Sequence, residues 1–266
     1  MKYVSFLDIM GFKETLRKKN QNKAKEYIDC FSTTVYEIWN NSNTKGLKGH
    51  IVSDSFIIYT DTTSPTQLEI MMNIIITICK AEFTHNSILI RGGLAKGEFD
   101  KIPAKELNTL SKNLIVGQAY IDAYLLESAS KSFGISIEES VYKDLDNCNY
   151  DLSSIIYNKK TNKYIIRYID IDYLLKDNNL YSFINLAKES NWLPHYYNAL
   201  GYAIKNERNY KKIDQLFYDI INIICNNNSN DNYPEINTFI ENAFADDVDY
   251  NFKSRLLRFI RQRITK

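Results

Sequence analysis

The chain has 266 residues, of which 44% are hydrophobic and 24% charged, and its formal net charge is +1. This length allows one large domain or a domain with an appendage, and the apolar content is sufficient for a real core. A charge so close to zero gives no bulk attraction to nucleic acid or to a membrane surface, so neither is an expected partner.

Cysteine usage and the apolar runs bear on location. The longest apolar run, residues 70–79, is too short to span a bilayer, and the first residues do not form a signal peptide. The four cysteines are scattered and contain no CxxC pair, which disfavours a zinc site and favours a reducing compartment. We therefore expect a cytoplasmic protein.

Strand and helix patterns alternate over the first 170 residues. The expected elements are, in order, a strand at 2–9, a helix at 12–39, a hairpin of strands at 50–53 and 56–60, a helix at 64–83, a strand at 87–96, a helix at 116–131, a strand at 134–137, and a hairpin of strands at 154–157 and 164–170. Gly92 and Gly93 in the middle of a strand predict either a bulge or a close approach of backbone or ligand.

After about residue 175 the pattern is helical throughout. Helices are expected near 180–189, 195–206, 210–226, 235–244 and 250–264. Strands interleaved with helices, followed by helices alone, predict an α/β domain at 1–175 and an α-helical C-terminal extension at 176–266. The last helix is rich in arginine, and we expect its apolar stripe to pack and its charges to face water.

Two carboxylates interrupt apolar runs. Asp8 ends the first predicted strand, and Asp54 sits at the tip of the first hairpin. An acid in such a run is costly to bury unless something pairs with it. Two acids at neighbouring strand ends can share hard divalent ions such as Mg²⁺. The alternative is that Asp8 caps the following helix and Asp54 is an ordinary turn residue.

Four segments carry a family resemblance, in matching order and spacing. They are Phe6 to Phe12, Val52 to Phe56, Ile90 to Gly97 and Val116 to Glu127. Together they resemble the class III nucleotide cyclase catalytic domain over residues 3 to about 170. The Asp-Ile-x-Gly-Phe start, the Ser-Asp-Ser hairpin and the Arg-Gly-Gly strand are most similar to the pyrimidine nucleotide cyclases of Pycsar anti-phage systems.

The resemblance implies a ferredoxin-type palm sheet with flanking helices, of mixed α/β (α+β) class. It implies conversion of UTP or CTP to 3′,5′-cyclic UMP or cyclic CMP and pyrophosphate, with two Mg²⁺ or Mn²⁺ ions. The product would be a second messenger read by a separate effector protein. It also implies a homodimer with composite active sites.

Site residues follow from the same alignment of motifs. The resemblance implies that Asp8, Asp54 and the backbone carbonyl of Ile9 bind the metal ions. Backbone N–H groups of Met10, Gly11 and Phe12 at the start of a helix suit the β- and γ-phosphates. An ordinary strand-to-helix turn at Gly11 is an equal alternative.

His50 stands four positions before Asp54, where purine cyclases of the family carry a base-reading Lys. A His there can bond a pyrimidine edge, and the alternative is a plain loop residue. The family's transition-state Asn and Arg correspond to Ile121 and Leu125, which cannot donate hydrogen bonds. The purine-selecting Asp corresponds to Leu114.

Another cation must therefore meet the charge that develops on phosphate. Arg91 and Lys96 are the predicted catalytic cations, although a strand Arg also commonly binds a carboxylate. The missing hydrogen-bonding groups leave a catalytically inactive nucleotide-sensing module as the alternative function. A palm polymerase or a diguanylate cyclase is disfavoured because Ser53-Asp54-Ser55 replaces their Gly-Gly-acid-acid hairpin.

Overall fold

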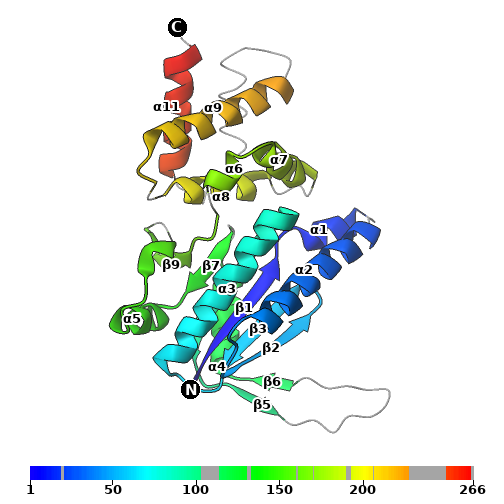
Figure 1. The fold of residues 1–266 in the computed structure, drawn as a ribbon, viewed down its shortest axis with the longest axis vertical. Coiled ribbons are helices and arrows are strands. Elements are labelled where there is room, and N and C mark those ends of the chain that lie inside the picture. Colours follow the sequence, from blue (N-terminus) through cyan, green and yellow to red (C-terminus); the bar gives the residue numbers. More distant parts are fainter. Residues whose placement is uncertain are drawn as a thin grey trace.

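The computed structural model describes residues 1–18, 21–102, 114–130, 133–159, 161–169, 171–189, 193–205, 207–227 and 250–264. Figure 1 shows a sheet with flanking helices at one end and a group of helices, ending in the red C-terminal helix, at the other. The predicted helix at 235–244 lies outside the described residues. Among the described helices, none combines the length and apolar character needed to cross a bilayer.

The described elements follow the predicted order closely. They are β1 Lys2–Ile9, α1 Phe12–Arg17, α2 Gln21–Asn41, β2 Leu47–Val52, β3 Ser55–Thr60, α3 Pro65–Asn86, β4 Ile90–Gly97, β5 Asp100–Ile102, β6 Leu114–Val116, α4 Gln118–Ser128, β7 Gly134–Ile137, α5 Glu139–Asn147, the 3₁₀ turn η1 Leu152–Ser154, β8 Ile155–Asn158, β9 Lys163–Ile166, α6 Ile171–Leu174, α7 Asn179–Glu189, α8 Leu193–Ile204, α9 Tyr210–Asn227 and α11 Tyr250–Ile264.

Seven strands form one sheet in the order β2-β3-β1-β4-β7-β9-β8. The first four strands have the ferredoxin-type arrangement, because β1 lies between β3 and β4 and pairs antiparallel with both. β4 and β7 pair in parallel, and β9 and β8 extend the sheet as a hairpin. The predicted fold class, a mixed α/β sheet followed by helices, is confirmed.

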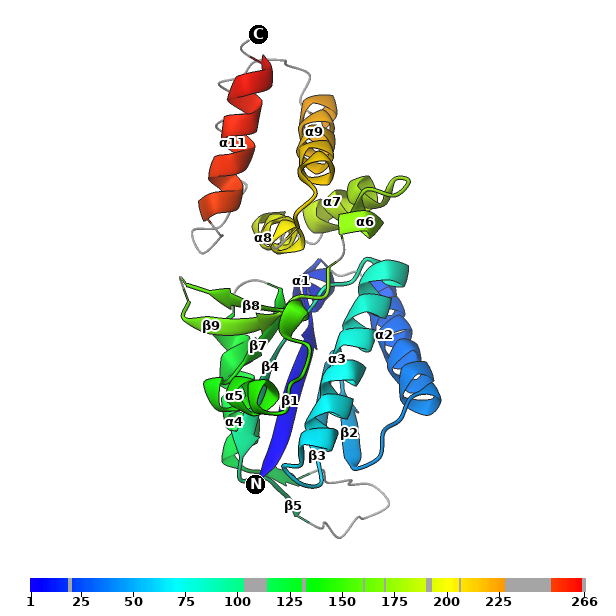
Figure 2. The same cartoon turned by 60° about the vertical axis from the view of Figure 1, so that its left-hand side comes forward.

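Helices cover both faces of the sheet. Figures 1 and 2 show α2 and α3 side by side against one face, where Leu7 and Ile9 of β1 join their core. Val4 and Phe6 point the other way and pack with Ala119 of α4. This alternation follows from the two-residue period of a strand, so β1 is buried on both sides. It also fixes which β1 side chains reach the site.

Several boundaries differ from the prediction. The long first helix is divided into α1 and α2, and β5 and β6 lie between the predicted strand at 87–96 and the predicted helix at 116–131, where no strand was expected. α5 was missed because its sequence is largely polar and its buried side chains include only two apolar ones, Val141 and Leu145. The register of β4 with β1 is continuous through Gly92 and Gly93, so the bulge alternative was wrong.

The close-approach alternative for the glycines is confirmed. A Cβ added to Gly93 would lie 2.0 Å from the backbone oxygen of Ala123 in α4, and one added to Gly92 would lie 2.4 Å from the backbone oxygen of Phe6. α4 therefore rests directly on the backbone of β4. Any side chain at Gly93 would push the helix away.

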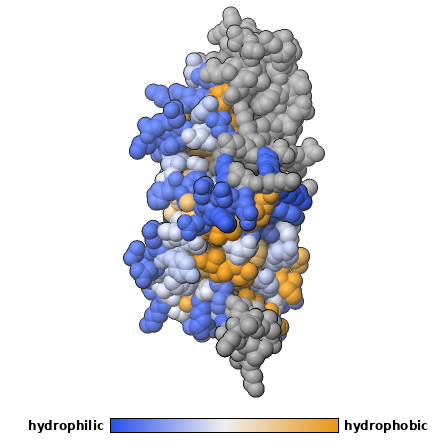
Figure 3. All heavy atoms as spheres, turned by 90° about the vertical axis from the view of Figure 1, so that its right-hand side faces the viewer, coloured by the Kyte–Doolittle hydropathy of each residue, from blue (hydrophilic) through white to orange (hydrophobic). Residues whose placement is uncertain are grey.

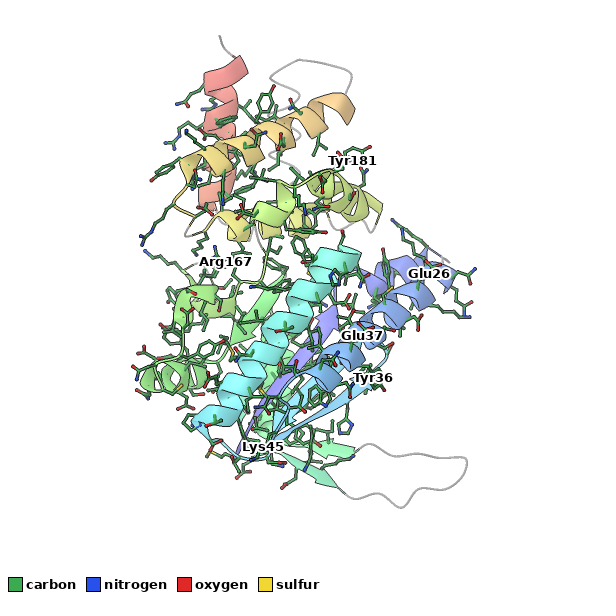
Figure 4. The ribbon with its side chains drawn as sticks, in the orientation of Figure 1. Glu26, Tyr36, Glu37, Lys45, Arg167 and Tyr181 are labelled. Atoms are coloured by element: carbon green, nitrogen blue, oxygen red, sulfur yellow. The ribbon has the colours of Figure 1, made fainter. Side chains whose placement is uncertain are left out.

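The C-terminal helices share the core of the sheet. The ring of Phe183 in α7 packs edge-on against Phe83 of α3, with centroids 5.7 Å apart. Tyr202 of α8 lies 5.4 Å from Phe133, at the start of β7. Figure 4 shows Arg167, just after β9, between the two parts, where its guanidinium donates to the Lys205 carbonyl. The domain boundary at residue 175 stays a prediction.

Candidate active site

Asp8 and Asp54 lie at the same end of the sheet. Asp8 is opposite Ser55 of β3 and opposite Arg91 of β4. Asp54 is in the tight turn between β2 and β3, where Ser53 adopts a left-handed φ of 56°. The backbone N–H of Ile9 donates to the Asp54 carbonyl at 3.1 Å. The hairpin tip is thus bonded to the residue that follows Asp8.

The Asp8 carboxylate is largely buried, with its side chain 16% exposed. The Ser55 hydroxyl donates to its Oδ1 at 3.1 Å, and Arg91 Nη2 lies 3.2 Å from its Oδ2. Burial, and then the charge of Asp54, raise the pKa of Asp8, while Arg91 and Ser55 act in the opposite direction. A cation placed between the two acids would relieve this repulsion.

The donor set fits a divalent metal that brings further ligands with it. No group of three or more His, Cys, Asp or Glu side chains gathers as a metal cage within the part of the chain that the structure describes. Mg²⁺ typically takes one or two carboxylates and completes its shell with water and substrate phosphates. Asp8 and Asp54 meet that requirement. The role of the Ile9 carbonyl stays a prediction.

α4 packs on the face of the sheet that carries Phe6 and Asp8. Phe6 of β1 makes edge contacts with Tyr120 and Tyr124, at centroid distances of 6.1 and 5.4 Å. At the end of the helix, Glu127 Oε1 lies 2.6 Å from Arg91 Nε. Glu127 was not among the predicted site residues.

A signal for Glu127 is present in the sequence. Ala119, Ala123 and Glu127 stand four residues apart and therefore occupy one buried stripe of α4. A lone acid that continues a stripe of small residues requires a buried partner.

Ile121 and Leu125 project away from the sheet. Their exposed fractions are 49% and 54%, and neighbouring Tyr124 is 47% exposed. Figure 3 shows apolar surface gathered in the lower part of the face that it presents. At the two positions where the resemblance expects hydrogen-bonding groups, α4 thus offers apolar side chains. The side chain of Leu114 lies outside the described part of the chain.

His50 lies on the α4 side of the sheet. Its partner in β3 is Ile57, which in turn faces Phe6 of β1. The imidazole stacks on Tyr59, with centroids 5.8 Å apart, and the tyrosine oxygen lies 3.4 Å from Nε2. Partial burial, and then the charge of Lys101, lower the pKa of His50. A neutral imidazole can both donate and accept a hydrogen bond.

Lys96 is on the wrong face of the sheet for the predicted role. It is five residues from Arg91 in the same strand, so the two side chains point to opposite faces. Its Nζ pairs with Asp144 of α5 at 2.7 Å, beside the hydroxyl of Tyr3. Lys96 is therefore not among the cations that meet Asp8, and the structure corrects that prediction.

One of the three predicted phosphate donors has a backbone partner within the protein. The N–H of Met10 donates to the Leu89 carbonyl at 2.9 Å, which corrects its predicted role as a phosphate donor. Gly11 has a φ of 84°, so the turn uses its backbone freedom. Phe12 begins α1 with a buried side chain. Phosphate binding at Gly11 and Phe12 stays a prediction.

Comparison with known proteins gives remote structural neighbours. No protein-family model and no curated protein matches the chain. Among solved structures, the adenylyl cyclase CyaB from P. aeruginosa is similar with a TM-score of 0.48 and 17% identity, over 62% of this chain and 92% of that one. A guanylyl cyclase domain of the RhoGC fusion protein from Blastocladiella emersonii has a TM-score of 0.47 and 20% identity, over 62% and 91%.

A third neighbour is the guanylate cyclase domain of RhGC from Catenaria anguillulae, in complex with GTP. Its TM-score is 0.42 at 16% identity, over 62% of this chain and 94% of that one. All three neighbours are nucleotide cyclase domains.

Proposed function

We propose that the chain is a class III-type nucleotide cyclase that converts UTP or CTP to the 3′,5′-cyclic monophosphate and pyrophosphate. The observation that carries the proposal is the meeting of Asp8 and Asp54 at one end of the sheet, where the charge of Asp54 helps to raise the pKa of Asp8. The sequence resemblance adds the role: an anti-phage second messenger, made in the cytoplasm and read by a separate effector.

The chemistry divides between the bound ions and the protein. When bound, two Mg²⁺ or Mn²⁺ ions would activate the ribose 3′-oxygen and neutralise charge on the triphosphate. Asp8 and Asp54 would hold them, and Gly11 and Phe12 would contribute backbone donors to the phosphates. Burial of the Asp8 carboxylate strengthens these electrostatic interactions because water is excluded there.

The choice of a pyrimidine rests on His50 and Leu114. Leu114 has no polar group with which to select a purine. By the resemblance, His50 stands where the purine cyclases of the class III family carry a base-reading Lys. The lowered pKa of His50 favours the neutral ring, which can pair with either a carbonyl or an amino group on a pyrimidine edge. Stacking on Tyr59 holds the ring in position.

We expect purified protein with Mn²⁺ or Mg²⁺ to convert UTP or CTP, and not ATP or GTP, to the cyclic monophosphate. Chromatography of the products of all four triphosphates measures this directly. If ATP or GTP is converted and neither UTP nor CTP is, the pyrimidine assignment is wrong and the cyclase assignment still holds. No cyclic product from any of the four would remove both.

The second candidate function is a nucleotide sensor without turnover. It is favoured by the apolar, exposed side chains of Ile121 and Leu125, which cannot stabilise a transition state through hydrogen bonds. Tight binding of a triphosphate with no product in the same assay would select this function. Retention of both Asp8 and Asp54 speaks against it, because a sensor has little need for two metal-binding acids.

Dimer formation is part of the proposal. Ile121, Tyr124 and Leu125 give α4 an exposed apolar surface next to the site, which suits a second copy of the chain completing a composite site. We expect Leu125→Glu to weaken a dimer by about 2 kcal/mol or more, roughly thirtyfold in Kd, as for a central contact in an interface. Sedimentation equilibrium measures the change.

Tyr36→Glu is the matched control, because Tyr36 is also exposed and aromatic but lies on α2, as labelled in Figure 4. We expect it to leave the association unchanged. Equal dissociation constants for the wild type and Leu125→Glu, or a wild type that stays monomeric at all concentrations, would contradict a dimer through α4.

A further inference from the structure

A guanidinium is shared by two carboxylates from different elements at the edge of the site. Arg91 Nη2 lies 3.2 Å from Asp8 Oδ2, and Arg91 Nε lies 2.6 Å from Glu127 Oε1. The Arg91 Nε–H group donates to Asp8 Oδ2, which lies 3.4 Å from Nε. The contact between Arg91 Nε and Glu127 Oε1 is therefore ionic and has no aligned hydrogen bond. Arg91 therefore links α4 to the end of β1.

The register of α4 on β4 explains why Glu127 reaches Arg91. Gly93 lies directly against the backbone of Ala123, since a Cβ added to it would be 2.0 Å from the Ala123 oxygen. Four residues further along the helix rise by about 6 Å, and two residues back along the strand span about 6.6 Å. The same contact therefore brings Glu127 next to Arg91.

Burial makes this pairing energetically important. The side chains of Glu127, Arg91 and Asp8 are 4%, 22% and 16% exposed. Leaving one of these charges without its partner costs several kcal/mol of desolvation. If Glu127 carried no charge, Asp8 would be the one of these two carboxylates left to pair with the guanidinium, and Arg91 would neutralise it more fully. Glu127 draws part of the positive charge away from Asp8.

We propose that Glu127 and Arg91 are a positioning pair that holds the Asp8 carboxylate in place and keeps it available as a ligand for a divalent cation. This inference rests on the proposed metal site and deepens it. Arg91, assigned from sequence as a phosphate cation, then acts through Asp8. Glu127 acts through Arg91 and touches neither substrate nor metal. Loss of the Glu127 charge lowers metal affinity by about 10- to 100-fold, the usual effect of removing a group that orients a ligand.

The test is Mn²⁺ binding, followed through the electron paramagnetic resonance signal of the free ion in the absence of nucleotide. We expect Glu127→Gln to raise the Mn²⁺ Kd by about 10- to 100-fold and Glu127→Asp to recover part of that loss. The Mn²⁺ concentration that gives half-maximal activity should shift in parallel.

Glu82→Gln is the matched control, since Glu82 is also a buried glutamate on a helix but belongs to α3. It should leave the Mn²⁺ Kd unchanged. Thermal unfolding checks that each variant folds. If Glu127→Gln does not fold, Arg91→Lys is the second variant to test. It keeps the positive charge but loses the forked guanidinium, and it should also raise the Mn²⁺ Kd.

The outcomes separate the two proposals. Unchanged Mn²⁺ affinity in Glu127→Gln, with affinity lost in Asp8→Asn, overturns the positioning pair and leaves the metal site intact. A wild type whose Mn²⁺ affinity equals that of Asp8→Asn overturns the metal site and, with it, the positioning pair. A weakened Glu127→Gln with a partly restored Glu127→Asp supports both.

Discussion

Asp54→Asn is expected to reduce cyclase activity by at least about 10²- to 10³-fold, the range found when one group that stabilises transition-state charge is removed. Asparagine has nearly the same shape and keeps the turn, but its neutral oxygen is a weak ligand for Mg²⁺. The backbone bond from Ile9 to the carbonyl of residue 54 is retained. Initial rates of cyclic nucleotide formation, with far-UV circular dichroism of the same samples, measure the effect.

Asp61→Asn is the control on the same hairpin. Asp61 directly follows β3 and makes an exposed ion pair with Lys48 at 2.9 Å, so its loss should change activity little. Comparable activity in the wild type and Asp54→Asn would mean that the acid at the hairpin tip is only a turn residue. The two-acid site would then have to be abandoned.

Gly93→Ala is expected to destabilise the protein by about 3 kcal/mol or more, at the upper end of the costs of overpacking. The added methyl would overlap the Ala123 carbonyl oxygen at 2.0 Å, and the residues that carry the two groups have backbones held in a strand and a helix. The helix must move, which also separates Glu127 from Arg91. Urea unfolding followed by circular dichroism measures the stability change.

Gly97→Ala tests whether the effect depends on the close approach. Gly97 is in the same strand, and a Cβ there would meet its nearest atom, the Ala119 backbone nitrogen, at 3.3 Å. We expect a loss of less than about 1 kcal/mol, mostly from small adjustments of the helix. Equal losses at Gly93 and Gly97 would show that the α4–β4 contact is not the tight one described above.

The backbone of the site could be predicted from sequence because its signals are local. β1 is a mostly apolar run that ends near Asp8 and Gly11, and the hairpin is two short runs around Asp54, so both patterns depend on neighbouring residues only. β5, β6 and α5 were missed for the opposite reason. Their segments are short or polar, and tertiary packing decides their structure.

Side-chain partners were harder to predict because they depend on register between distant elements. The place of Lys96 was nevertheless accessible, since a five-residue separation from Arg91 in one strand puts the two on opposite faces. The hydrogen bond from the Met10 N–H to the Leu89 carbonyl could not be predicted from sequence, because it depends on how the end of β1 meets the start of β4. To predict that Glu127 pairs with Arg91, one would have to know the contact between Gly93 and Ala123.

The aromatic contacts between the two ends of the molecule have a consequence for its unfolding. Phe83 and Phe133 are fully covered, and each touches a ring from the C-terminal helices, Phe183 and Tyr202 respectively. Proteolytic removal of those helices would leave two large rings facing water, a surface that favours self-association. We expect the contacts to make these helices unfold together with the sheet, and nucleotide bound near Asp8 should then protect them from digestion.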